Sequence, residues 1–168
     1  MAISAYTKTT WANSPTTTSP VSAANLQHIE DQVKDITDTV RTPVAYSPVL
    51  AFGGSSAGIT YATQSGWSIK IGRIVFFGGL VELTNKGSAS GAATISLPET
   101  ASSTYYSTTS LSLYAVTFAN AFESRIFNSA TVLDLYEITE SGTRTTLTNS
   151  DFANNSAVFF SGQYISAS

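Results

Sequence analysis

The feature that most constrains the fold is a series of short apolar segments that alternates with turn sequences from residue 43 to residue 168. The segments are rich in β-branched and aromatic residues, which favour strands. The turns are rich in Gly, Ser and Asn, for example GGSSAG at 53–58 and NKGSASG at 85–91. Short strands at such intervals are typical of a sandwich or barrel. We therefore expect a mainly β protein, with an antiparallel β-sandwich or jelly-roll knob at 43–168.

Two of these segments carry more detailed predictions. In VELT at 81–84 apolar and polar residues alternate, which predicts a half-exposed strand. IVFFGGL at 74–80 is apolar throughout, so we expect both of its faces to be covered, the second by a neighbouring subunit in a trimer. Gly78-Gly79 within it predicts a bulge or a close backbone approach. The full set of expected strands is 46–52, 59–62, 67–71, 74–84, 92–96, 110–118, 124–127, 132–138, 143–147 and 158–165.

One helix is expected, at 22–41. Ser22 is a good N-cap, and Pro43 ends the helix because the residue before a proline is driven out of the α region. Apolar residues recur inside the helix with spacings of 3, 4, 3 and 4, which makes a heptad seam. The seam residues are Leu26, Ile29, Val33, Ile36 and Val40.

Two interpretations of this helix are open: an amphipathic helix on its own sheet, or a short parallel coiled coil. The apolar stripe is narrower than that of a helix packed in a globular core, because polar residues flank it. Ile at the d positions with Leu or Val at the a positions favours three or four strands over two. We favour oligomeric packing as a trimer, in which another domain also oligomerises, since so short a coil does not hold alone.

Residues 1–21 are expected to form an irregular arm. The stretch KTTWANSPTTTSP at 8–20 is polar and punctuated by proline. Trp11 is its one large apolar side chain. We expect this indole to dock either on its own domain or on a partner.

The charge content excludes several classes of partner. Only 11% of residues are charged, against ~25% in a typical domain. The basic residues are scattered, which excludes a nucleic-acid footprint. No apolar stretch approaches the ~20 residues that span a bilayer, so no membrane insertion is expected. The polar surface must then consist mostly of hydroxyls and amides, which suits subunit interfaces or sugar binding.

No pattern in the sequence predicts an enzyme. His28 is the only histidine, and it falls on the flank of the helix with no nucleophile motif to complete a triad. Asp134 and Glu137 lie three apart on an expected strand, so they point to opposite faces, unlike the paired carboxylates of a glycosidase. Distant pairs such as Glu82 with Glu123 stay open at this point.

No cofactor or metal ion is expected. The chain has no cysteine, which excludes thiolate metal sites. The oxygen-rich loop TNSDFANNS at 148–156 has Asp151 as its single acid and lacks the order of an EF-hand. We expect a turn there, with a calcium ion as the alternative.

The N-terminal sequence resembles a known pattern. TTWANSPTTTSPVSAANLQHIEDQV at 9–33 is similar to a segment common in virion proteins of tailed bacteriophages. In that pattern a Trp is followed by a Ser-Pro or Thr-Pro turn and then by Ala-x-x-Leu-x-x-Ile-Glu. The matching positions here are Trp11, Ser19-Pro20, Ala23, Leu26, Ile29 and Glu30.

Residues 43–98 resemble the globular domain that ends many such phage appendages. The recurring elements are YSP at 46–48, GITY at 58–61, KIG at 70–72, VFF at 75–77 and the LTNKG turn at 83–87. Beyond residue 100 the chain is similar only in style, and a binding surface is expected there.

The resemblance implies a homotrimeric virion surface protein, assembled in the bacterial cytoplasm and released by lysis. The structural role is a capsid decoration, a head fibre or a short tail fibre. The arm would anchor it to another virion protein of the capsid, tail or baseplate, through Tyr6, Trp11, Pro15 and Pro20.

The alternative that the resemblance leaves open is host attachment, in which the knob recognises a cell-surface glycan. The candidate sugar-stacking residues are Tyr105, Tyr106, Tyr114 and Tyr136. For each of them a place in the core or in a trimer interface is the competing interpretation.

Overall fold

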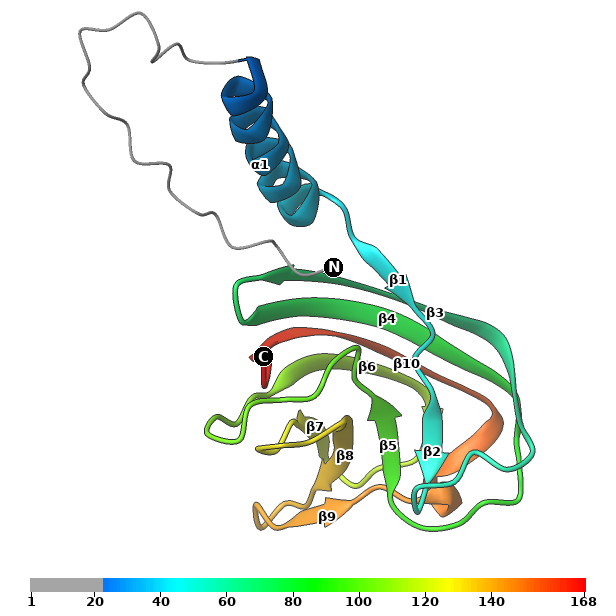
Figure 1. Cartoon of the computed structure of the whole chain (residues 1–168). Helices are drawn as coiled ribbons and strands as arrows, with labels where there is room; N and C mark the ends of the chain where they lie inside the picture. The colour runs from blue at the N-terminus through cyan, green and yellow to red at the C-terminus, as the bar shows by residue number, and fades with distance from the viewer. Residues whose placement is uncertain (1–22) are drawn as a thin grey trace, which may run out of the picture. The chain divides into compact units, whose positions relative to one another are not determined.

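The computed structural model describes residues 23–168 (Figure 1), with the side chains of 27–36 and 42–168. The expected arm at 1–21, with its proposed anchoring residues, and the expected N-cap Ser22 lie outside the described residues. The chain divides into two compact units, with the boundary between Thr42 and Pro43. We call residues 43–168 the β unit.

The predicted helix is present as α1, Ala23–Arg41. It ends directly before Thr42-Pro43, as the restriction on the residue before a proline predicts. On its polar flank Gln27 Nε2 donates to Asp31 Oδ1 at 3.0 Å, a pairing of residues one turn apart.

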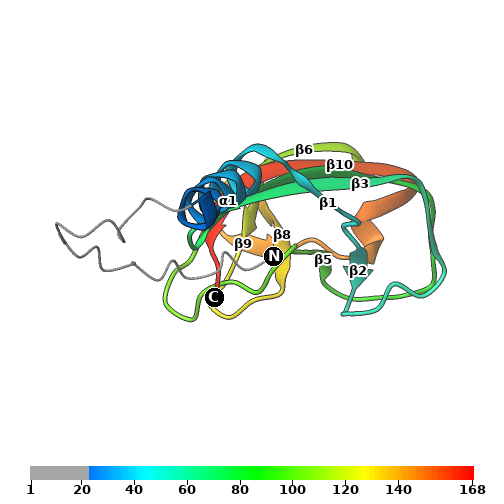
Figure 2. The ribbon, with the colours of Figure 1, turned by 45° about the horizontal axis from the view of Figure 1, so that its top comes forward.

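The β unit consists of two antiparallel sheets, so the chain is mainly β as predicted (Figure 1). The long sheet has the order β1-β3-β4-β10-β6, and the short sheet has the order β2-β5-β8-β7 with β9 beside β8. In the turned view the long sheet lies as one layer over strands of the short sheet (Figure 2). The strands are β1 (Val44–Tyr46), β2 (Leu50–Phe52), β3 (Ile59–Ile71), β4 (Ile74–Lys86), β5 (Ala93–Ser96), β6 (Thr109–Val116), β7 (Ala121–Arg125), β8 (Val132–Ile138), β9 (Arg144–Thr146) and β10 (Phe152–Ile165).

Several predicted strand boundaries are wrong. β10 begins at Phe152 rather than at residue 158, and β7 begins at Ala121 rather than at residue 124. The segment 46–52 is two strands, because the chain leaves the long sheet after Tyr46 and enters the short sheet at Leu50. Between them Pro48, which has no N–H to give to a ladder, is buried. Conversely, 59–62 and 67–71 form the single strand β3. Gly66 in its middle leaves room for the Tyr46 ring, since a Cβ there would lie 2.6 Å from Tyr46 Cε1.

The core lies between the two sheets and is almost entirely apolar. Val81 and Leu83 are buried while Thr84 is exposed, which confirms the predicted alternation in 81–84. The Phe77 ring packs edge-on against Tyr164 from β10, with centroids 5.4 Å apart. Large buried members from both sheets are Leu50, Phe52, Val75, Phe77, Val81, Ile95, Leu133, Leu135 and Val158.

The pair Gly78-Gly79 marks a close approach, one of the two predicted possibilities, in a part of β4 whose register with β3 is continuous. A Cβ on Gly79 would lie 2.6 Å from the Ser65 carbonyl oxygen and 2.8 Å from the Phe160 ring. A Cβ on Gly78 would lie 3.1 Å from the Trp67 indole. Glycine is therefore needed at 79 for the closed face of the sheet, and at 78 it gives the indole a flat surface.

Candidate functional site

Within the described residues, the exposed large apolar side chains gather in two places. One is the heptad seam of α1, and the other is the long sheet together with the loop before β6. Side chains of the short sheet contribute none. The members are Ile29, Val33 and Ile36 on α1, and Val44, Trp67, Ile71, Ile74, Tyr105, Tyr106, Tyr114 and Phe159 in the β unit.

The seam residues of α1 whose side chains are described are open to solvent. Ile29 is 40% exposed, Val33 58% and Ile36 52%. The side chains of Leu26 and Val40, the other predicted seam residues, lie outside the described ones. The seam therefore presents β-branched side chains at a and d positions, the composition that favours three or more strands.

The outward face of the long sheet is built from rows of residues that the strand register places side by side. In one row Trp67 of β3 is opposite Gly78 of β4, which is opposite Ser161 of β10. In the next row Leu80 of β4 is opposite Phe159 of β10. Trp67 is 42% exposed and Phe159 47%. Within the described chain only the inward face of 74–80 is covered, so the predicted cover of its outward face by a neighbouring subunit stays a prediction.

Two hollows lie on this face. The first has a volume of about 640 Å³. It is lined by Trp67, Phe159, the backbone of Gly78 and hydroxyl side chains of β3, β10 and β6. The second has a volume of about 400 Å³ and lies at the end of the sheet where β4 begins. It is lined by Ile74, Tyr105, Tyr106, Ser107, Thr108, Gln163, Tyr164 and Ile165.

The structure brings together two of the four predicted sugar-stacking tyrosines. Tyr105 and Tyr106 line the second hollow, and the Tyr106 ring packs edge-on against Phe127 with centroids 5.8 Å apart. Tyr114 lies apart from them on β6 and is 63% exposed. Tyr136 is half-buried in the short sheet, with the Arg144 guanidinium 5.4 Å from its ring centroid.

Sequence reasoning missed the two aromatic residues of the first hollow, Trp67 and Phe159. The sequence signal that could have found them is the alternation of strand residues between two faces. Trp67 lies on the same face of its strand as Ser65 and Ile71, and Phe159 on the same face as Ser161 and Gln163. These outward positions mix apolar and hydroxyl residues, so alternation alone does not distinguish them from core positions.

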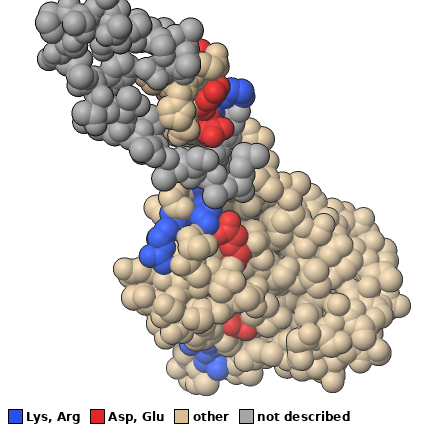
Figure 3. All heavy atoms as spheres, viewed as in Figure 1, with Lys and Arg blue, Asp and Glu red and all other residues tan. Residues whose placement is uncertain are grey.

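The outward face of the short sheet carries a group of charged residues instead. Glu123 Oε1 pairs with the guanidinium of Arg144 and lies 3.3 Å from Arg125 Nε. Asp134 is half-buried beside them, opposite Arg125 in the β7–β8 ladder, and burial raises the pKa of its carboxyl. Burial also raises the pKa of Tyr136, with the charge of Asp134 adding to the effect and that of Arg144 opposing it. On the side of the β unit that Figure 3 shows, the surface is mostly uncharged and the charged residues form small groups.

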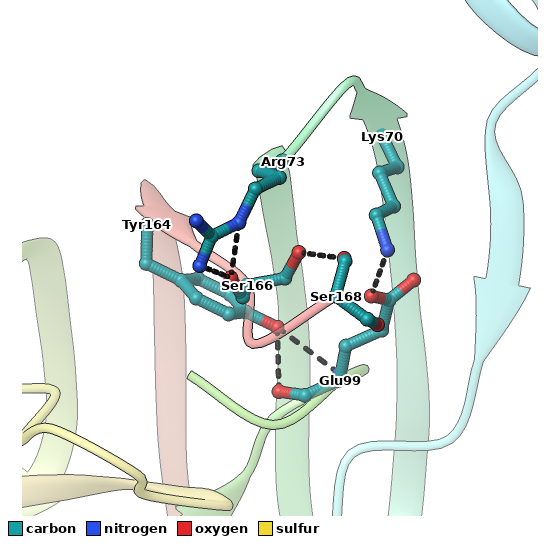
Figure 4. A network of polar contacts seen from close by, with 6 residues as sticks. All are labelled: Lys70, Arg73, Glu99, Tyr164, Ser166 and Ser168. Carbon is teal, nitrogen blue, oxygen red and sulfur yellow. Dashed lines mark hydrogen bonds and ion pairs between the residues drawn. The ribbon is translucent and has the colours of Figure 1, made fainter. Parts of the chain in front are cut away.

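A polar network fastens the end of β10 to the turn between β3 and β4 (Figure 4). The Tyr164 hydroxyl accepts from the Glu99 backbone N–H at 3.0 Å and donates to the Glu99 carbonyl at 2.8 Å. The Glu99 carboxylate pairs with Lys70 Nζ at 2.7 Å. Arg73 donates twice to the Ser166 carbonyl, at 3.1 and 2.8 Å. Burial raises the pKa of Tyr164 to about 12, so this hydroxyl serves as a neutral structural link.

The carboxylates considered for catalysis are not brought together. Glu82 lies on the long sheet, where it accepts from Thr63 Oγ1 at 3.1 Å, whereas Glu123 lies on the short sheet. Glu137 accepts from the Ala119 backbone N–H at 2.8 Å, on the face of β8 opposite to Asp134. His28 is exposed on α1.

The first half of the oxygen-rich segment 148–156 forms the 3-10 helix η1, Asn149–Asp151, with a capping box, whereas its second half, from Phe152 on, belongs to β10 and not to the predicted turn. Asp151 Oδ2 accepts from the Thr148 backbone N–H at 2.7 Å, and Asn149 Oδ1 accepts from the Gly91 N–H at 3.0 Å. These oxygens therefore bind the protein's own backbone, in keeping with a turn. Among the side chains that the structure describes, those of 27–36 and 42–168, no group of three or more His, Asp or Glu is placed to hold a metal ion.

No helix in the described part of the chain is long and apolar enough to cross a membrane. No protein-family model, curated protein or solved structure matches this chain.

Proposed function

We propose that this protein is a non-enzymatic structural component of a bacteriophage virion, a homotrimeric surface appendage. Its N-terminal arm anchors it to a capsid or tail protein, α1 sets the threefold register, and the β unit is a jelly-roll knob displayed outward. The observation that carries the proposal is the exposed heptad seam on a helix that leads directly into a β unit.

The length of the helix supports assembly through both units. Its 19 residues span ~28 Å at ~1.5 Å per residue. A coil of this length does not hold chains together by itself, so the β units must contribute contacts. The sparse charge of the β unit supports a display role, because such a surface has little electrostatic steering and suits broad contacts.

The solution mass of the full-length protein, measured by light scattering, tests the trimer. We expect three times the chain mass of 17.7 kDa. The double variant Ile29→Ser/Ile36→Ser should shift the mass toward the monomer at low concentration. The flank variant Gln27→Ser/Glu30→Ser is the matched control and should keep the trimer. A monomeric parent protein would contradict the proposal.

Particle association tests the virion role separately. Purified protein should label phage particles that lack it, as seen by immunogold electron microscopy. The Trp11→Ala variant should keep its solution mass and lose this labelling. Full labelling by the Trp11→Ala variant would show that Trp11 is not needed for anchoring.

A second candidate function is host attachment through a glycan. The observation that favours it is the pair of exposed tyrosines in the second hollow, since adjacent tyrosine rings beside the amide of Gln163 suit stacking and hydrogen bonding to a sugar. A glycan array with the parent protein and with Tyr105→Ala tests it. Binding that the substitution abolishes supports attachment, and the absence of binding leaves the structural role alone.

A further inference from the structure

We propose that the outward face of the long sheet is an interface between copies of this chain, with Trp67 and Phe159 at its centre. The occupant is a second copy of the same protein. The inference rests on the proposed homotrimer and adds the surface through which the β units meet.

The first support is the distribution of apolar side chains in the β unit. Trp67, Ile71, Ile74 and Phe159 are all on the outward side of the long sheet and all at least 40% exposed. Large apolar side chains gathered on one face mark an interaction site on a soluble protein. The short sheet, with its charged outward face, offers no comparable surface.

The second support is the size of the face. The strands of the long sheet have 3, 13, 13, 14 and 8 residues in spatial order. At ~3.3 Å per residue and ~4.8 Å between strands, they cover ~800 Å². A stable protein interface buries ~800 Å² on each partner, so this face alone is large enough.

The third support is the absence of charge. Along β4 the outward positions are Ile74, Phe76, Gly78 and Leu80, with Glu82 following at the end of the row. The facing positions on β10 and β6 are Phe, Ser, Gln and Ile rather than charged residues. Two copies therefore meet without burying an unpaired charge, and serine hydroxyls are available for hydrogen bonds across the interface.

The fourth support is continuity along the chain. The helix α1 ends at Arg41, and β1, the edge strand of the long sheet, begins at Val44. Helices that assemble through their seam therefore hold the edges of their long sheets only two residues from the bundle. A saccharide in the first hollow would contact Trp67 and Phe159, but it would leave Ile71 and Ile74 in water.

Trp67 makes the proposal testable by fluorescence. The chain has two tryptophans, so Trp11→Phe leaves Trp67 as the only one in the full-length protein. We expect blue-shifted emission and protection from acrylamide in this parent. Adding Phe159→Lys should raise the concentration for half-assembly by ~10-fold or more, the effect of losing a central aromatic anchor. The emission should then shift to the red.

Matched variants separate the face from general effects of charge. Thr145→Lys adds the same charge to an exposed position on β9 and should change neither mass nor emission. Ser112→Lys, an exposed position in the same row as Phe159, should act like Phe159→Lys. Far-ultraviolet circular dichroism checks that each variant is folded. If Phe159→Lys does not fold, Ser112→Lys provides the test.

The outcomes distinguish this inference from the proposed function. A trimer in which acrylamide reaches Trp67 freely would overturn the interface and leave the appendage proposal intact. The seam variant Ile29→Ser/Ile36→Ser could stay assembled and then dissociate when Phe159→Lys is added. That result would support the interface and show that the helix seam is not needed for assembly. A monomeric parent whose Trp67 emission responds to a glycan mixture would overturn self-association and assign the face to a sugar.

Discussion

The outward faces of the two sheets differ, although their inward faces are alike. Both sheets send Leu, Val, Ile and Phe side chains into one shared core. Outward, the long sheet carries Trp67, Ile74 and Phe159, whereas the short sheet carries Glu123 and Arg144. Folding of a single chain requires only the inward set. The outward apolar residues of the long sheet are therefore not needed for folding, and we propose that they contact protein, whereas the charged residues of the short sheet are suited to contact with water.

The largest expected effect on stability is a difference between the core-facing side of the long sheet, at Gly79, and its outward side, at Gly78. Gly79→Ala should lower the free energy of unfolding by about 3 kcal/mol, because its Cβ would meet the Ser65 backbone and the Phe160 ring. Gly78→Ala should cost less, about 1 kcal/mol, because its Cβ would lie 3.1 Å from the Phe160 carbonyl oxygen and from the Trp67 indole, contacts that a shift of a few tenths of an ångström relieves. Urea unfolding at one fixed protein concentration measures both. Equal costs would contradict the difference between the faces.

The next effect concerns the buried hydroxyl at the end of the long sheet. Tyr164→Phe should lower the free energy of unfolding by about 2 kcal/mol, because it leaves the Glu99 backbone N–H and carbonyl without their partner. The exposed Tyr114→Phe is the matched control and should have no effect.

Tyr164 also gives the protein a predicted pH dependence. Its pKa is raised from 10.0 to about 12, so the folded state holds this proton more tightly than the unfolded state. Its contribution to stability is complete below pH ~10 and is lost as the pH rises toward ~12. The stability of Tyr164→Phe should therefore fall less steeply over that range, and an equal slope would contradict the assignment.

A smaller effect is expected for the charges of the short sheet. Arg144→Met should lower the free energy of unfolding by about 0.5 kcal/mol, since Arg144 pairs with Glu123 at a partly exposed site. The difference should vanish in ~1 M NaCl, because salt screens exposed pairs. Gln163→Met on the long sheet should give a salt-independent change. A salt response at the long sheet would break the comparison.

The smallest effect has the opposite sign. Because burial raises the pKa of Asp134, the folded state binds this proton more tightly, and the carboxyl's contribution to stability falls as the pH rises through the raised pKa. Asp134→Asn should equal or exceed the parent in thermal stability at pH 7, and the difference should shrink in acid. Asp151→Asn, which weakens the capping box, should instead lower it. A clear loss for Asp134→Asn would show that its charge is needed by Arg125.

Local signals predicted the helix and many of the strands, because Pro43 and the alternation in VELT act within a few residues. They failed where a distant contact decides. The segment 46–52 divides because its two halves join different sheets, and β3 stays continuous through Gly66 because the Tyr46 ring packs there.

The candidate site shows the same limit. Tyr105 and Tyr106 were named from the sequence as candidate sugar-stacking residues, with the core or a trimer interface as the competing interpretation. Trp67 and Phe159 were missed, because they share a face only through the position of β4 between β3 and β10. No local pattern encodes that strand order. The sequence therefore indicates which types of residue line an exposed face, but it does not indicate which individual residues lie together on that face.

The place of β10 has a consequence for biosynthesis. This strand comes last in chain order and lies inside the long sheet, between β4 and β6. About 110 residues separate the end of α1 at Arg41 from the start of β10 at Phe152, which a ribosome needs ~5–20 s to add. The outward face of the long sheet thus does not exist until β10 has been translated. In the proposed assembly, neighbouring nascent chains therefore meet first through their helices, and the long sheets associate only once β10 is in place, which delays exposure of the apolar face.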